Sequence, residues 1–220
     1  MKAMILAAGR GERLRPLTDE TPKPLIKVAG KSLIEYHLEN LANAGFKEII
    51  INTAWLAEKI HQRLGDGSNY GVNIKYSDEN EALETAGGII NALPLLGNEA
   101  FVVVNGDIWC DFNFSTLPKL KSGIQSHLVL VKNPQHNPEG DFTLQDALIK
   151  NTGKNMRTFS GIGLYTTKFF AQQEKKSLPL APIIRKKCET NLVSGQYYDG
   201  LWTDVGTVER LQVLEDKLTS

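Results

Sequence analysis

The residues best suited to chemistry lie in a loop that follows the first apolar run of the chain. Gly9 and Gly11 let the backbone turn sharply and expose N–H groups to a ligand. Positive charge surrounds these glycines, carried by Arg10, Arg13, Arg15 and Lys23. Such a loop suits a polyphosphate, although a plain solvated loop can have the same composition. The P-loop motif is absent, because no Gly-Lys-Ser/Thr follows, and the third glycine of a dinucleotide-binding fingerprint is missing.

Polar residues also follow two later apolar runs. Asn52 comes directly after one run, and Asn105, Gly106 and Asp107 come at the end of another. Because ligands bind beyond the carboxyl ends of parallel strands, we expect these residues to share one sheet edge with the glycine loop. Asp107 would repel a polyphosphate there unless a divalent cation such as Mg²⁺ bridged the two. The alternative for Gly106 and Asp107 is a simple turn, which aspartate favours.

A longer string of residues resembles the signature of the sugar-nucleotide pyrophosphorylases. These nucleotidyltransferases join a nucleoside triphosphate to a sugar 1-phosphate. The matching string is Leu6-Ala7-Ala8-Gly9-Arg10-Gly11-Glu12-Arg13-Leu14-Arg15-Pro16-Leu17-Thr18, followed by Pro22-Lys23-Pro24. Two more segments match, Val104-Asn105-Gly106-Asp107 and Trp202-Thr203-Asp204-Val205-Gly206-Thr207. The resemblance therefore covers nearly the whole chain.

The resemblance implies a role for each matched position. Arg13 and Lys23 would be catalytic and would stabilise negative charge on the triphosphate. Asp107 and Asp204 would hold the Mg²⁺ cofactor. The nucleotide would contact Leu6, Ala7, Ala8, Gly9, Gly11, Arg13, Lys23, Glu79 and Gly87. The sugar would contact Asn105, Gly140, Asp141 and Ser160.

Reasoning from the residues alone leaves other roles open for several of these positions. Asp204 can also be an N-cap or a turn residue before the last helix. Gly87 can reflect ordinary packing at the start of a helix. The polar loop 133–142 contains His136 and can be either a sugar pocket or a plain surface connection. Trp55, Trp109 and Trp202 can stack on a ligand, but large aromatic residues more often belong to the core.

The expected reaction is Mg²⁺-dependent transfer of a uridylyl group from UTP, or another nucleoside triphosphate, to a sugar 1-phosphate. Among the sugars, the resemblance implies N-acetylmuramate 1-phosphate, as used in peptidoglycan recycling. The sugar phosphate needs no general base, because its second pKa is about 6 and it is largely dianionic near neutral pH. One alternative is a guanylyl- or thymidylyltransferase acting on mannose or glucose 1-phosphate. Another is a non-catalytic nucleotide-binding regulatory subunit, which would have no need to retain Arg13, Lys23, Asp107 and Asp204 together.

Apolar runs and helical patterns alternate through the first half of the chain. Ala3–Ala8, Phe46–Ile51 and Phe101–Asn105 have the continuous apolar character of buried parallel strands. Ser32 and Glu35 form a capping box that predicts a helix ending near Gly45. This alternation predicts an α/β fold with three αβα layers and a Rossmann-like, mainly parallel mixed sheet. The resemblance implies that it is the nucleotide-diphospho-sugar transferase fold.

Further helices and one more strand are predicted beyond this framework. Glu84–Leu93 is expected to be helical and to end before Pro94, and the Phe169-Phe170 pair is expected to begin a helix. A C-terminal helix is expected over Glu209–Leu218. Ser126–Lys132 is predicted as a strand.

Composition places the chain among ordinary globular proteins. Of its 220 residues, 41% are hydrophobic, and 25 Lys and Arg balance 25 Asp and Glu, so no global field attracts nucleic acid or a membrane surface. The 2 cysteines form no disulfide framework or zinc pattern. We expect a single catalytic domain over residues 1–220, without a C-terminal β-helix domain, in the cytoplasm, with no nucleic-acid or membrane partner.

Overall fold

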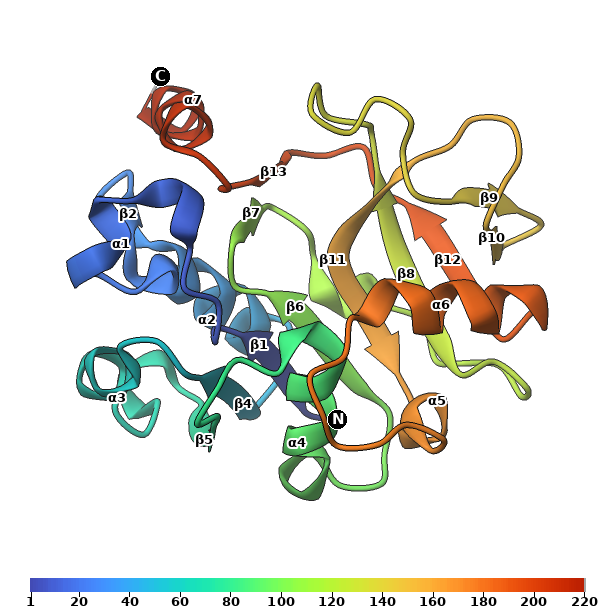
Figure 1. Cartoon of the computed structure of the whole chain (residues 1–220), viewed down its shortest axis with the longest axis horizontal. Coiled ribbons are helices and arrows are strands. Elements are labelled where there is room, and N and C mark those ends of the chain that lie inside the picture. Colours follow the sequence, from blue (N-terminus) through green and yellow to red (C-terminus); the bar gives the residue numbers. More distant parts are fainter. Residues whose placement is uncertain (220) are drawn as a thin grey trace.

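The computed structural model describes residues 1–219, whose main sheet has nine strands in the order β5-β4-β1-β6-β11-β8-β12-β10-β9 (Figure 1). The first four strands of this order are parallel. They are β5 (Asn73–Asp78), β4 (Glu48–Thr53), β1 (Ala3–Leu6) and β6 (Phe101–Asn105). This parallel half confirms the strands predicted from the apolar runs, although β1 ends at Leu6 rather than at Ala8.

The second half of the sheet is mixed. β11 (Thr158–Tyr165) runs antiparallel to β6 and to β8 (Ser126–Val131), and β8 is parallel to β12 (Val193–Tyr197). β10 (Leu148–Lys150) is antiparallel to β12 and to β9 (Thr143–Gln145). The sheet is therefore continuous across both halves of the described chain.

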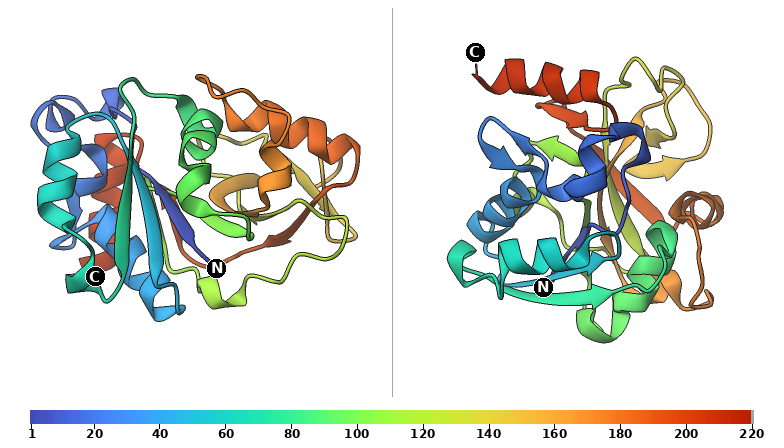
Figure 2. Two further views of the ribbon diagram at one scale, coloured as in Figure 1. Left: turned by 90° about the horizontal axis from the view of Figure 1, so that it is seen from below. Right: turned by 60° about the vertical axis from the view of Figure 1, so that its left-hand side comes forward.

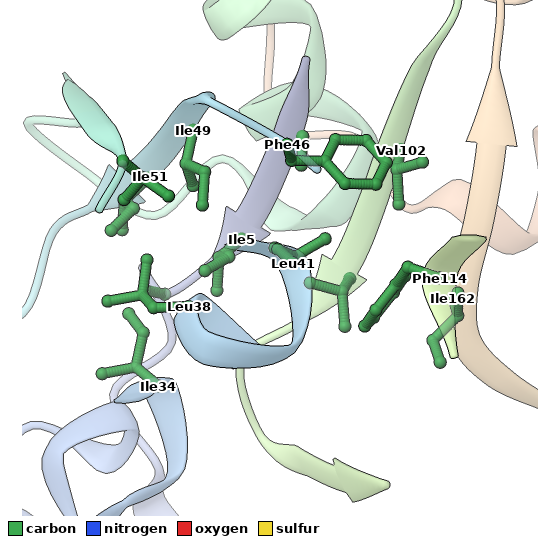
Figure 3. Close-up of a cluster of buried hydrophobic side chains, with 14 of the residues drawn as sticks. Ile5, Ile34, Leu38, Leu41, Phe46, Ile49, Ile51, Val102, Phe114 and Ile162 are labelled. Carbon is green, nitrogen blue, oxygen red and sulfur yellow. The ribbon is translucent and has the colours of Figure 1, made fainter. Parts of the chain in front are cut away.

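Helices cover both faces of the sheet, which confirms the three-layer prediction. One core packs α2 (Leu33–Asn43) and α3 (Ala57–Leu64) on the sheet, and the other packs α4 (Glu84–Leu96), α5 (Thr167–Phe170) and α6 (Leu180–Glu189). Alternate residues of a strand point to opposite faces, so Ile49 and Ile51 belong to the first core and Ile50 to the second. Figure 3 shows the α2 side chains of the first core beside Ile5 and the β4 isoleucines.

A third, smaller core lies beneath the C-terminal helix α7 (Val208–Thr219), which packs on β2 (Lys27–Val28) (Figure 2). β2 pairs with β3 (Lys31–Ser32). The buried residues of this third core are Val28, Leu33, Trp109, Val205 and Leu214. This core fixes β13 (Trp202–Asp204), which pairs with β7 (Ile108–Cys110). Burial of Trp109 favours the core interpretation of this tryptophan over a stacking role.

Three details of the secondary structure differ from the prediction. α4 continues past Pro94 to Leu96, because proline has a helical φ and Leu96 gains burial in the second core. Phe169 and Phe170 end a single helical turn instead of beginning a helix. β7, β12 and β13 were not predicted, since short strands next to loops carry little periodicity. Cys110 and Cys188 are both buried free thiols, and no helix in residues 1–219 has the length and apolar character needed to cross a membrane.

The predicted capping box at the start of α2 is present, and it forms part of a larger polar network. Glu35 accepts hydrogen bonds from the backbone N–H and hydroxyl of Ser32 at 3.0 and 2.6 Å. Its other oxygen accepts from Arg63 Nη2 at 2.7 Å and from the Tyr70 hydroxyl at 2.8 Å. Burial alone raises the pKa of Glu35, but these hydrogen bonds and the charge of Arg63 outweigh it and lower the pKa to about 2.

This lowered pKa predicts a loss of stability in acid. The ionised Glu35 stabilises the fold above its ordinary pKa of 4.5, and that stabilisation is lost as the pH falls from 4.5 towards about 2. The unfolding free energy of the wild type should therefore fall by about 3 kcal/mol more than that of Glu35→Gln between pH 5 and pH 2. Urea unfolding at several pH values measures this difference. Glu39→Gln, on the same helix but half-exposed, is the control, and parallel curves for wild type and Glu35→Gln would contradict the prediction.

Candidate active site

Most of the predicted nucleotide-contacting residues, together with Asn105 and Asp107, meet in one cleft at the carboxyl ends of the parallel strands. The cleft has a cavity volume of about 360 Å³. It brings together the loop after β1, Asn52 after β4, the segment after β5 and the residues after β6. The prediction that these segments share one edge of the sheet is thus confirmed. Of the predicted nucleotide-contacting residues, the cleft is lined by Leu6, Ala7, Ala8, Gly9, Gly11, Arg13, Lys23 and Glu79.

Lys23 and Asp107 form an ion pair at one end of the cleft. Lys23 Nζ lies 2.7 Å from Asp107 Oδ2, and Lys23 is only 8% exposed. Lys23 starts a short 3-10 helix after Pro22, whose extended backbone directs the chain into the cleft. Gly11 has a φ of +72°, and a β-carbon there would lie 3.1 Å from the Cβ of Lys23. The glycine loop therefore packs tightly on the stem of the lysine and helps to aim its ammonium group.

The three arginines of the glycine loop have different surroundings. The Arg10 guanidinium lies 3.9 Å from the centre of the Trp55 ring, and its Nε lies 2.7 Å from Glu12 Oε1. Arg15 Nε lies 2.8 Å from Asp19 Oδ1. Arg13 is exposed and lines the cleft, and it has no hydrogen bond or ion pair within the described part of the chain. Arg13 is thus the loop arginine whose charge remains available to an anionic ligand.

Asp204 is brought next to the Asp107 segment by the β7–β13 pair. Asp204 pairs with Ile108, and the Val205 N–H donates to the Asp107 carbonyl oxygen at 2.8 Å. Asp204 is therefore a strand residue, and the interpretation of this position as a helix N-cap or turn is wrong. The carboxylate does not itself line the cleft, but Gly206, two residues further on, does.

The Asp204 carboxylate has cationic and imidazole neighbours. Oδ2 accepts a hydrogen bond from Arg210 Nη1, and Oδ1 lies 3.2 Å from His136 Nε2. Oδ1 is nevertheless buried without a hydrogen-bonded partner among residues 1–219. Asp204 Oδ1 is thus a carboxylate oxygen without a hydrogen-bond donor in the described chain, on the segment beside Asp107. Such an oxygen is a suitable ligand for a divalent cation that prefers oxygen ligands. No group of three metal-ligating side chains occurs in the described residues, so phosphate and water oxygens would complete the ligand set.

His37 lies beneath this end of the site. It is fully buried in α2, and burial lowers its pKa to about 4, against the opposing influence of the Ile108 backbone and the Asp107 charge. His37 is therefore neutral at pH 7 and adds no positive charge beside Asp107. The balancing charge comes from Lys23.

The other end of the cleft is organised by Asn52, which the sequence placed at this edge without a role. Its Oδ1 accepts from the Ala7 N–H at 2.9 Å, and its Nδ2 donates to Glu79 Oε1 at 2.7 Å. Glu79 Oε2 in turn accepts from the Leu83 N–H at 2.9 Å. This chain of bonds ties the segment after β5 to the end of β1. Both carboxylate oxygens of Glu79 already have protein donors.

Gly87 does not line the cleft, although the resemblance placed it at the nucleotide. The N–H groups of Ala86 and Gly87 donate to the Leu178 carbonyl oxygen at 2.9 and 3.1 Å. A β-carbon at Gly87 would lie 2.3 Å from the Lys176 carbonyl oxygen. The glycine thus allows close packing of α4 against the segment before α6. These contacts agree with the alternative that Gly87 serves ordinary packing at the start of a helix.

The predicted sugar-contacting residues are divided in space. Asn105 lines the cleft, whereas Gly140, Asp141 and Ser160 do not. Asp141 accepts hydrogen bonds from Asn137 Nδ2 at 3.1 Å and from the Phe159 N–H at 2.8 Å, which tie the loop 133–142 to β11. Buried Ser160 accepts from the Ile162 N–H at 3.1 Å. These contacts are all within the protein and hold Asp141 and Ser160 outside the cleft.

The sequence analysis did not name three residues of the site individually. Glu84 and Thr85 line the cleft, and Arg210 pairs with Asp204. Arg210 carried a weak signal, because it falls in the first turn of the predicted last helix, close behind Asp204.

A parallel-stranded edge that joins a glycine loop, a buried lysine paired with an aspartate, and an unpaired arginine defines a nucleotide-binding α/β protein. Residues 2–143 match the family model described as nucleotidyl transferase, and the chain belongs to this family. Members of the family generally use a divalent metal ion.

Full-length relatives and a solved structure agree with this assignment. The N-acetylmuramate alpha-1-phosphate uridylyltransferase of Neisseria meningitidis serogroup B is 56% identical over 221 residues, covering 96% of both chains. The protein of the same name from Caulobacter vibrioides is 30% identical over 98% of this chain and 96% of its own. The inositol-1-phosphate CTP transferase from T. maritima superposes with a TM-score of 0.79 at 20% identity, covering 100% of this chain and 96% of its own, which shows a shared fold.

Proposed function

We propose that this chain transfers the uridylyl group of UTP to N-acetylmuramate α-1-phosphate, forming UDP-N-acetylmuramate and pyrophosphate in peptidoglycan recycling in the cytoplasm. The choice of substrates is supported by the 56% identity to the N. meningitidis relative that bears this name, over 96% of each chain. The transfer chemistry is supported above all by one observation. The ion pair between buried Lys23 and the partly exposed Asp107 lies in the same cleft as the unpaired Arg13, at the edge where a nucleotide binds.

The reaction depends on neutralising the negative charges of the two substrates and on aligning them, more than on proton transfer. A phosphate oxygen of the sugar 1-phosphate attacks the α-phosphorus of UTP, the new P–O bond forms, and the α–β phosphoanhydride bond breaks to release pyrophosphate. Arg13 and Lys23 would stabilise the negative charge that grows on the α-phosphate and the leaving group. The dianionic nucleophile needs no general base, because its second pKa is about 6.

Asp107 and Asp204 would hold the metal ion, and Mg²⁺ is the ion we propose. When bound, it would supply further charge neutralisation to the phosphates. The chain's own contribution is positional. The β7–β13 pair fixes the backbone of both aspartates, and the Lys23 ammonium balances the Asp107 charge.

The sugar side is assigned to the second half of the chain. His136 of the loop 133–142 contacts both Asp204 and Arg210, so this loop borders the proposed metal position. Asn105 also lines the cleft, two residues before Asp107. We also propose that the described residues act as one catalytic domain, supported by a single sheet that takes strands from both halves.

A panel of substrates tests the proposal. Pyrophosphate release should be measured for UTP, dTTP, GTP and CTP, each with N-acetylmuramate, N-acetylglucosamine, mannose and glucose 1-phosphate. We expect UTP with N-acetylmuramate 1-phosphate to give the highest kcat/KM, and chelation of divalent metal to abolish it. A higher kcat/KM with another pair, for example GTP and mannose 1-phosphate, would overturn the substrate assignment. The assignment to the nucleotidyltransferases would still hold. No release with any pair would favour a non-catalytic nucleotide-binding protein.

A further inference from the structure

Glu84 has a backbone conformation that is costly for its residue type. It is the first residue of α4 and has a φ of +58°. Side chains with a β-carbon clash in this left-handed region, where glycine is the residue normally found. Of the non-glycine residues with positive φ in the described chain, Glu84 is the one that lines the cleft. Strained residues of this kind gather at functional sites, where another gain offsets their cost.

No interaction of the Glu84 side chain within the described part of the protein offsets this backbone strain. It is exposed and makes no hydrogen bond or ion pair within residues 1–219. It also does not cap α4, which has no side-chain cap. An ionised carboxylate only accepts hydrogen bonds. Its complement is therefore a ligand group that carries hydroxyl or N–H donors.

The layout of the cleft indicates which part of a nucleotide would supply those donors. Glu84 follows β5 and Asp107 follows β6, and these strands are three positions apart in the sheet, or about 14 Å at the usual strand spacing. Arg13 and Lys23 are the cleft's cationic side chains and attract the phosphates. A carboxylate at the opposite end meets the uncharged nucleoside.

Within the nucleoside, the ribose suits Glu84 better than the base. Glu79, which is 7% exposed, lies deeper, and its carboxylate already accepts from Asn52 and the Leu83 N–H. Glu84 lies at the exposed rim beside Thr85. Vicinal ribose hydroxyls offer two adjacent donors to the two oxygens of a carboxylate, and acidic side chains bind ribose hydroxyls in other α/β nucleotide sites.

We propose that Glu84 binds the ribose of the nucleotide, its carboxylate accepting hydrogen bonds from the 2′- and 3′-hydroxyls, and so selects UTP over dUTP. This inference rests on the proposed function, because it takes the cleft to bind a nucleoside triphosphate. The favourable ribose contact offsets the backbone strain when the nucleotide is bound.

The test compares UTP with dUTP. Pyrophosphate release should be measured with N-acetylmuramate 1-phosphate, and nucleotide binding should be measured by calorimetry without the sugar. We expect the wild type to prefer UTP by about tenfold or more, as for hydrogen bonds to a charged group. Glu84→Gln and Glu84→Gly should bring this ratio to within about twofold, by weakening UTP and not dUTP.

Matched variants separate recognition from backbone effects. Glu81→Gln removes a neighbouring acid that does not line the cleft, and Asp146→Gly replaces another positive-φ residue far from it in sequence. Both should keep the wild-type ratio. The melting temperature of Glu84→Gly should be no lower than that of the wild type. Glycine adopts this φ without a clash, and this relief of strain offsets the greater conformational entropy that glycine gives the unfolded chain.

Each contrary outcome has a distinct meaning. Equal losses for UTP and dUTP, or a lowered melting temperature that accounts for the loss, would make Glu84 a structural residue and overturn the inference. An unchanged ribose ratio with reduced discrimination between UTP and CTP would assign Glu84 to the base and also overturn it. If the wild type formed no UDP-sugar, the proposed function would fail, and calorimetry with the two nucleotides would still decide the ribose contact.

Discussion

Replacing Lys23 by methionine is expected to lower kcat for pyrophosphate release by about 10²–10³-fold, the usual cost of removing one preorganised charge donor. Methionine retains most of the apolar stem of Lys23, which is 8% exposed and packs against Gly11. The loss is therefore electrostatic. The substitution removes a cation that would neutralise the phosphates. It also leaves the Asp107 carboxylate, which lies 2.7 Å from the ammonium in the wild type, without its partner.

Steady-state kinetics and a thermal melt together test this expectation. Lys27→Met removes an equivalent charge from an exposed position on β2, so its kcat should stay within about twofold of the wild type. Similar losses in the Lys23 and Lys27 variants would show that overall positive charge matters and that the aimed ammonium does not. A large drop in melting temperature for Lys23→Met alone would assign the loss to folding.

The second large effect is expected from Asp107→Asn and Asp204→Asn. Each change keeps the size of the side chain and removes a proposed ligand of the metal ion, so each should lower kcat by about 10²–10³-fold. Binding of Mn²⁺, measured by electron paramagnetic resonance, should weaken in both variants. Because the two carboxylates would serve one ion, the double variant should lose much less than the product of the single losses.

Asp111→Asn is the matched control for this pair. Asp111 follows β7 directly, bonds to the Tyr198 hydroxyl and does not line the cleft. Its replacement should leave Mn²⁺ binding and turnover near wild-type values. Undiminished Mn²⁺ affinity in Asp107→Asn and Asp204→Asn, or full wild-type turnover after chelation of all divalent metal, would refute the two-carboxylate metal site.

The parallel half of the fold could be predicted because its signals are local. The apolar runs at β1, β4 and β6 are continuous, since strands covered on both faces have no solvent side. The capping box that starts α2 is complete within four consecutive residues. Polar residues placed directly after the apolar runs, such as Asn52 and Asp107, predicted one common edge because parallel strands end together.

The second half was harder to predict because its strands are short and pair with distant partners. β13 has three residues and is defined by its pairing with β7, almost a hundred positions earlier in the sequence. No periodicity distinguishes such a segment from a loop. For this reason, reasoning from the residues alone left a turn or helix cap open for Asp204, an alternative that the strand pairing excludes.

Composition and spacing were enough to identify a basic loop suited to phosphate and to predict the αβα architecture. Tertiary structure alone decided which charges face the cleft. Arg10 and Arg15 are drawn towards Trp55 and Asp19, Arg13 is left unpaired, and Lys23 reaches Asp107 across 84 positions of sequence. It also decided that Gly87 serves packing and that Glu84 carries a strained backbone. Charge pairing and backbone strain depend on residues that only the folded chain brings close together. Hydrophobic periodicity and helix caps, in contrast, are determined by a few successive residues of the sequence.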